Sequence, residues 1–133
     1  MFLYLLNENQ KAAFFDIAHQ VIFVDRRLAN AETTYLNQLV SEAGMHQTPL
    51  ASNDPISVLV QVFDNRNSRL AVAIEVVALA IVDSEYHRLE DEFADELFEA
   101  FGLADDDHEY VNRIAEHVAA AAVAMWEIGD VEE

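Results

Sequence analysis

Two acidic clusters with the same spacing are the residues of this chain best suited to chemistry. Asp25 ends an apolar run and Glu32 follows seven residues later, and Asp83 and Glu90 repeat both residue types 58 positions further on. Hard divalent cations such as Ca²⁺ and Mg²⁺ prefer oxygen ligands of this kind. We therefore predict divalent-cation binding at these two acidic elbows, with the candidate ligands Asp25, Glu32, Asp83, Glu85, Glu90 and Asp91.

The two acidic clusters belong to a longer internal repeat. In one ungapped register six residue types recur at the same offset, at the pairs Ala13/Ala71, Val24/Val82, Asp25/Asp83, Glu32/Glu90, Leu39/Leu97 and Gly44/Gly102. Self-similarity at a fixed spacing indicates a repeated structural unit. The pattern predicts a duplicated helix–elbow–helix unit.

Helical periodicity places the elbow carboxylates on apolar faces. On a wheel of about 100° per residue, Asp25 falls on the side that carries Phe14, Ile17 and Val21. Glu32 shares the stripe of Leu36 and Leu39 in the next helix, and Glu90 repeats this position. We expect the carboxylates of each elbow to point inward from two different helices.

The elements that position these residues are expected to be helices throughout the chain of 133 residues. Alanine, leucine and glutamate are plentiful, and glycine and proline are scarce, which favours an all-α fold. A single compact domain, 1–133, is expected, with the first repeat at about 8–45, the second at about 67–103 and a C-terminal helix at about 106–127. Gly44 and Gly102 suit the left-handed residue that follows a helix. The six helices are expected near 8–25, 31–43, 55–64, 69–83, 88–101 and 108–126.

The two elbows differ in counter-charge. Arg26 and Arg27 flank Asp25 and could neutralise it directly, whereas Arg88 alone opposes the acids of the second elbow. If one elbow binds a cation, we expect the second. In the metal-free alternative, each aspartate accepts N–H bonds from the following helix and the glutamate closes the turn. Ala29 and His87 stand where a standard capping box would need serine, threonine, aspartate or asparagine.

The net charge of −18 limits the kinds of molecule that the chain is expected to bind. Phosphate contacts need lysine and arginine, of which there are only seven, so nucleic acid and anionic membrane surfaces are excluded. Residues 83–133 hold seventeen acids against Arg88 and Arg113. A protein partner that is basic or membrane-associated is expected. Phe23, Met125 and Trp126 leave a homodimer as an open alternative.

Three absences further limit the kinds of site and function that the chain can have. Cysteine is absent, which excludes disulfides and thiolate metal sites and fits a reducing compartment, so the cytoplasm is the expected location. The longest apolar stretch, Leu70 to Val82, is too short to span a bilayer and contains Glu75. The role of Glu75 is open between an edge position, a pairing with His19, Lys11 or an arginine, and a functional buried acid. Hydrolase and phosphate-binding motifs are missing, and we expect a non-enzymatic protein.

An apolar helix that ends in Val-Asp, with a glutamate seven positions on and a second copy in the chain, resembles the TerB-like (tellurite resistance TerB) domains. Asp25, Leu28 and Glu32 carry this resemblance in the first elbow. The matching residues in the second elbow are Asp83, Glu85, Tyr86 and Glu90. The chain departs from the family pattern at its glycine, where Arg26 and Ser84 stand. The resemblance covers about residues 7–126. It implies a compact helical fold with pseudo-twofold symmetry, divalent metal bound by the elbow acids, and an association with tellurite or stress response.

Overall fold

The computed structural model describes the backbone of residues 2–23, 30–45, 54–82 and 88–132. Side chains are described for the same residues except 21–23, 30–32, 88–91, 93 and 127–132. Within these residues the chain is helical and has no strand, so the prediction of an all-helical fold is confirmed. The α-helices are α1 (Glu8–Phe23), α2 (Asn30–Glu42), α3 (Ile56–Leu59), α4 (Arg66–Ile81), α5 (Arg88–Phe101) and α6 (Asp105–Glu132), with short 3-10 segments at Leu3–Leu5 and Val60–Val62.

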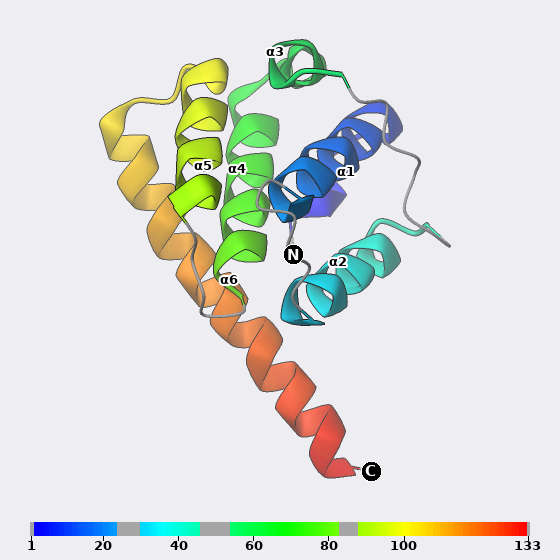
Figure 1. Cartoon of the computed structure of the whole chain (residues 1–133). Coiled ribbons are helices and arrows are strands. Elements are labelled where there is room, and N and C mark those ends of the chain that lie inside the picture. The colour runs from blue at the N-terminus through cyan, green and yellow to red at the C-terminus, as the bar shows by residue number, and fades with distance from the viewer. Residues whose placement is uncertain (1, 24–29, 46–53, 83–87, 133) are drawn as a thin grey trace.

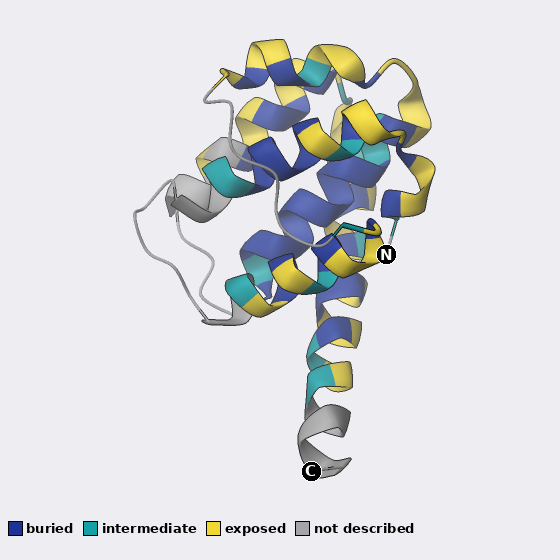
Figure 2. Cartoon of the chain, turned by 90° about the vertical axis from the view of Figure 1, so that its right-hand side faces the viewer, coloured by how far each residue is buried: buried dark blue, intermediate teal, exposed yellow. Residues whose placement is uncertain are grey.

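Helix α4 forms the centre of the molecule. It packs against α1, α2, α5 and α6 and against the 3-10 segment of the N-terminus (Figure 1). Residues Ala71 to Ala80 are all buried, as expected for a helix that is apolar nearly all round. Figure 2 shows this burial as a continuous dark helix, and it also shows the end of α6 extending beyond the other helices.

Helices α1 and α2 form a first pair, and α4 and α5 form a second. The helices of the second pair start at the same spacing from the first as the repeated residues in the sequence. Helices α1 and α4 have 16 residues each, and Arg66 starts α4 58 positions after Glu8 starts α1. Helices α2 and α5 begin at Asn30 and Arg88, which are separated by the same offset. Each pair is therefore joined by a segment of equal length.

Both second helices end in the same hydrogen-bonded motif. Gly44 and Gly102 have φ angles of 76° and 70°, as predicted for a left-handed residue after a helix. The N–H groups of Met45 and Leu103 donate to the carbonyl groups of Val40 and Phe98, at 3.1 and 3.0 Å. These are the bonds of a Schellman motif, which satisfies carbonyl groups that the helix end leaves free.

Asparagine caps the start of both first helices. The side chain of Asn7 accepts from the N–H of Gln10 at 2.9 Å, and Gln10 accepts in return from the N–H of Asn7, which forms a capping box. The side chain of Asn65 accepts from the N–H of Ser68 at 2.8 Å. With this cap, α4 begins at Arg66 and not near 69 as expected.

Other described helix bounds correct the sequence prediction. Helix α4 ends at Ile81, before the end expected near 83, and Val82 already lies in a turn. The end expected near 25 for the first helix lies outside the described residues, which stop at Phe23 in this part of the chain. The segment expected as a helix over 55–64 is a single turn of α-helix followed by a 3-10 turn. Helix α6 continues to Glu132, beyond the end expected near 126. None of the described helices is both long enough and apolar enough to cross a membrane.

Candidate functional site

The described helices fix where the predicted metal ligands lie along the chain. Asp25 and Asp83 follow α1 and α4 in the connecting segments, and Glu32 and Glu90 are each the third residue of the next helix. The side chains of the six predicted ligands, Asp25, Glu32, Asp83, Glu85, Glu90 and Asp91, lie outside the described ones. The proposed coordination is therefore a prediction about these elbows. Elsewhere, the described side chains include no group of three His, Asp or Glu residues placed to hold a metal ion.

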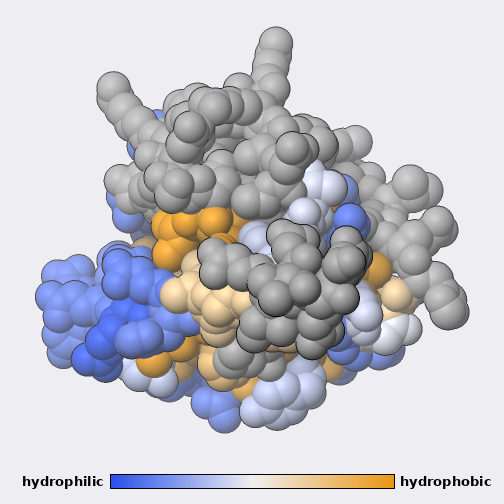
Figure 3. Space-filling model, turned by 90° about the horizontal axis from the view of Figure 1, so that it is seen from below, coloured by the Kyte–Doolittle hydropathy of each residue, from blue (hydrophilic) through white to orange (hydrophobic). Residues whose placement is uncertain are grey.

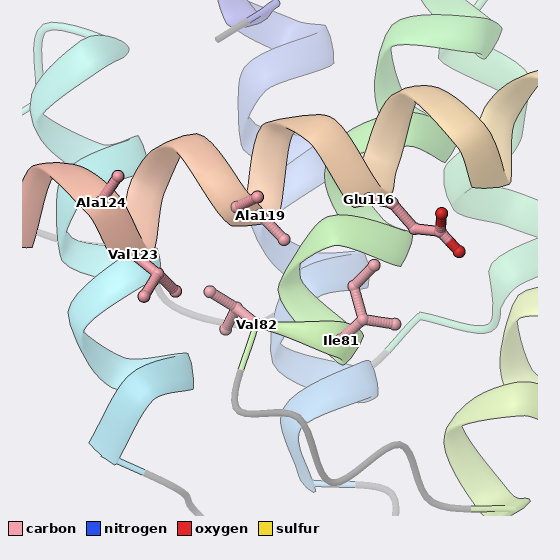
Figure 4. A pocket seen from close by; sticks show the side chains of 7 residues that line it. Ile81, Val82, Glu116, Ala119, Val123 and Ala124 are labelled. Carbon is pink, nitrogen blue, oxygen red and sulfur yellow. The ribbon is translucent and has the colours of Figure 1, made fainter.

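An open groove lies beside the second elbow, where α4 ends against α6. Seen from below, hydrophobic side chains gather on this face beside a hydrophilic area (Figure 3). The groove has a volume of about 420 Å³ and is lined by Ile81, Val82, Glu116, Ala119, Ala120, Val123 and Ala124. Figure 4 shows Ile81 and Val82 facing the row of side chains from α6, with Glu116 at one end of that row.

Glu116 is a residue that the sequence did not identify as part of a site. Its side chain is exposed and lines the groove at the end where Figure 4 shows Ile81. Periodicity within α6 marks Glu116 only as one exposed acid among several. Its place in the groove depends on the packing of α4 against α6, which sequence periodicity does not reveal.

The buried carboxylate of Glu75 forms the clearest polar cluster in the described core. Glu75 is 0% exposed, at the middle of α4. The hydroxyl of Tyr35 donates to Oε2 at 2.9 Å, and the backbone N–H of Phe2 donates to Oε1 at 3.1 Å. Both carboxylate oxygens thus have donors, from α2 and from the N-terminal segment. The edge position considered for Glu75 is wrong, because the residue is fully enclosed.

Tyr35 is held in its protonated form in this cluster. Burial raises the pKa of its hydroxyl well above the usual 10.0, and the charge and hydrogen bond of Glu75 raise it further. A neutral phenol is the form that can donate to Glu75. Because both side chains are shielded from solvent, the pair connects three segments of the fold and is not placed to meet a dissolved substrate.

One of the three aspartates in the first turn of α6 interacts with other parts of the chain. Asp107 accepts the N–H of Ala104 at 3.3 Å and pairs with the guanidinium of Arg66 at 2.6 Å. The hydrogen bond from Arg66 lowers the pKa of Asp107. Asp107 thus closes the first turn of α6, which begins at Asp105 and not near 108 as expected. Its pairing with Arg66 also joins the start of α4 to the start of α6.

The far part of α6 is connected to α2. The indole Nε1 of Trp126 donates to Oε1 of Gln38 at 3.1 Å. Trp126 is only half-buried, whereas its neighbour Met125 is 62% exposed. The apolar residues considered for a dimer surface therefore differ in role: Trp126 is engaged within the chain, and Met125 faces outward. The side chain of Phe23 lies outside the described ones.

Comparisons of the chain with models of known protein families, with curated proteins and with solved structures give no match.

Proposed function

We propose that this protein is a non-enzymatic helical module that binds a divalent cation at its second acidic elbow. The proposal includes the duplication of a helix–elbow–helix unit with pseudo-twofold symmetry. The observation that supports it most is the offset of 58 positions, which the helix starts, the asparagine caps and the Schellman glycines share with the elbow acids. With such an offset, Asp83 and Glu90 have the same chain positions relative to their helices as Asp25 and Glu32.

The second elbow is the better candidate for the cation on electrostatic grounds. An anion at the C-terminal end of a helix is unfavourable, so Asp83 needs a positive partner. Asp83, Glu85, Glu90 and Asp91 stand against Arg88 alone, whereas Arg26 and Arg27 follow Asp25 directly. Glu116 adds another carboxylate on this side of the molecule. Ca²⁺ and Mg²⁺ are the favoured ions because all these ligands are carboxylates.

The proposed biological setting follows from the resemblance to TerB-like domains. We propose that cation binding changes how the module meets a protein partner, in a stress response such as tellurite resistance. Asp83, Tyr86 and Glu90 support this, since they match the family pattern at the second elbow. Ser84 stands in place of the family's glycine, which makes direct measurement of metal binding the necessary first step.

Isothermal titration calorimetry tests the cation directly. Metal-free protein is titrated with Ca²⁺, Mg²⁺, Mn²⁺ and Zn²⁺, and so are the variants Asp83→Asn and Glu90→Gln. Each variant removes a charge with little change in shape and should weaken binding at least about tenfold, a loss of about 1.4 kcal/mol. The matched controls Asp25→Asn and Glu32→Gln in the first elbow should bind as the unmodified protein does. Absence of heat with every ion, or equal weakening in both elbows, contradicts the proposal.

A second candidate function is a metal-free protein-interaction module. The internal satisfaction of Glu75 favours it, because this chain provides hydroxyl and N–H donors for a buried carboxylate without a cation. In that case the elbow acids are also satisfied by the chain itself. The protein then acts by binding a protein partner through its surface.

A further inference from the structure

The groove between the end of α4 and α6 has the chemistry of a docking site for a peptide helix. Val82 and Ala119 are buried at its base, and Ile81 and Val123 are half-buried along its sides. Ala120 and Ala124 are exposed along the α6 edge. An open concave surface with apolar lining is a common feature of peptide-binding grooves.

The dimensions of the groove suit a helix. Its α6 residues recur at helical spacing, from Glu116 through Ala119, Ala120 and Val123 to Ala124. Eight residues of helix rise by about 12 Å, so the groove matches about two turns of an occupant helix. Alanine side chains are short and allow two helix axes to approach to about 8 Å. Figure 4 shows that the opposite side of the groove is formed by Ile81 and Val82.

The negative charge of Glu116 and of helices α5 and α6 favours a basic occupant of the groove. Glu116 lines one end. Among the other side chains of α5 and α6 that the structure describes, the exposed acids are Glu92, Asp95, Glu96, Glu99, Asp105, Asp106 and Glu109. From residue 89 onward the sequence contains a single lysine or arginine, Arg113. Figure 3 shows the hydrophilic area directly beside the hydrophobic one. A second copy of this chain would bring another net charge of −18, so charge disfavours a homodimer at this face.

We propose that this groove binds a basic amphipathic helix of a partner protein. The apolar face of the partner helix packs on Val82, Ala119 and Val123, and a lysine or arginine at its edge pairs with Glu116. Contact with the apolar base supplies affinity, and the acidic surroundings accelerate encounter and select basic sequences. This inference develops the interaction module named above and does not require a bound cation.

Binding of a designed helix tests the groove. The probe is a fluorescein-labelled 18-residue peptide with leucines on one helical face and lysines on the other. Its control has the same composition in scrambled order, which keeps the charge but removes the apolar face. Fluorescence anisotropy is measured in EDTA, so that metal binding makes no contribution and the cation proposal can fail or succeed separately.

Substitutions in the groove identify the site. Ala120→Arg places a long cationic side chain in the groove and should reduce affinity for the peptide at least about tenfold. Ala100→Arg makes the same change at an exposed position of α5 outside the groove and should have less than a twofold effect. Glu116→Gln should weaken binding several-fold, whereas Glu109→Gln, an exposed acid of α6 that does not line the groove, should not. Circular dichroism checks that each variant is folded.

Three results would overturn the proposal. Equal binding of the amphipathic and scrambled peptides would mean attraction to a polyanion without docking. Retention of full affinity by Ala120→Arg would place the peptide elsewhere. A dimer in light scattering that Ala120→Arg dissociates would make a second copy of this chain the occupant.

Discussion

At the scale of single residues, the hydrogen bond between Tyr35 and Glu75 links two helices inside the core. The two residues are 40 positions apart and both are enclosed. Sequence periodicity could mark Glu75 as an anomalous acid in an apolar helix, but it could not identify a phenol in another helix as a donor. Non-local side-chain pairs of this kind depend on how the helices pack, and a single sequence does not specify that packing.

Tyr35→Phe should lower the free energy of unfolding by about 1–3 kcal/mol. The substitution keeps the ring in the core but leaves Oε2 of Glu75 without the donor at 2.9 Å. Urea unfolding of both proteins measures the difference. Tyr110→Phe is the matched control because Tyr110 is 44% exposed, and its effect should be near zero. Equal stability of Tyr35→Phe and the unmodified protein would contradict the role assigned to this bond.

The same residue predicts alkaline sensitivity. The pKa of Tyr35 is raised in the folded state above its usual value of 10.0. Above about pH 10 the unfolded chain therefore loses a proton that the folded chain retains, and stability falls as pH rises. Below pH 10 the contribution is fully present. The stability difference between the unmodified protein and Tyr35→Phe should shrink by about 1.4 kcal/mol per pH unit above pH 10. A constant difference from pH 8 to 11.5 would contradict this.

At the scale of the elements, the sequence predicted the helices well where capping residues and periodicity agree. The glycine stops after α2 and α5 are confirmed by their positive φ angles. The start of α4 was missed because Ser68, and not Glu or Gln, stands at the third helical position after Asn65. Helix α6 extends beyond the expected end near 126 and includes Gly129, because glycine inside a helix costs only about 1 kcal/mol.

The two glycine stops should respond alike to substitution. Gly44→Ala and Gly102→Ala each force a side chain into a left-handed conformation, at a cost of about 1–2 kcal/mol. A Cβ atom at either position meets nothing within 4 Å, so the cost is backbone strain and not a steric clash. Asparagine at the same positions should cost less, since it tolerates this conformation. Chemical denaturation measures all four variants, and a stabilising alanine would contradict the assignment.

The candidate site was predictable only in part. The offset of the elbow acids is visible in the sequence, and the helix bounds place Glu32 and Glu90 in the first turn of α2 and α5. The groove beside the second elbow and the presence of Glu116 in it depend on the contact between α4 and α6. That contact joins residues more than thirty positions apart, such as Val82 and Ala119, which helical periodicity cannot pair.

At the scale of the whole molecule, net charge should govern stability. A charge of −18 on 133 residues repels itself, and the repulsion is stronger in the compact state than in the unfolded chain. Raising the salt concentration from 0.1 to 1 M shortens the screening length from about 10 to about 3 Å. The melting temperature should therefore rise with NaCl, and choline chloride should act similarly if screening is the cause. A melting temperature that falls with both salts would contradict this.

Thermal unfolding in the presence and absence of divalent cations tests the central proposal most directly. A ligand that binds only the folded state stabilises it by about 2.7 kcal/mol at a concentration 100 times its Kd. With excess Ca²⁺ or Mg²⁺, we predict a higher melting temperature than in EDTA for the unmodified protein and for Asp25→Asn. The rise should be absent in Asp83→Asn and Glu90→Gln. A melting temperature that these ions and the chelator leave unchanged, or a rise that survives in both second-elbow variants, would contradict cation binding at the second elbow.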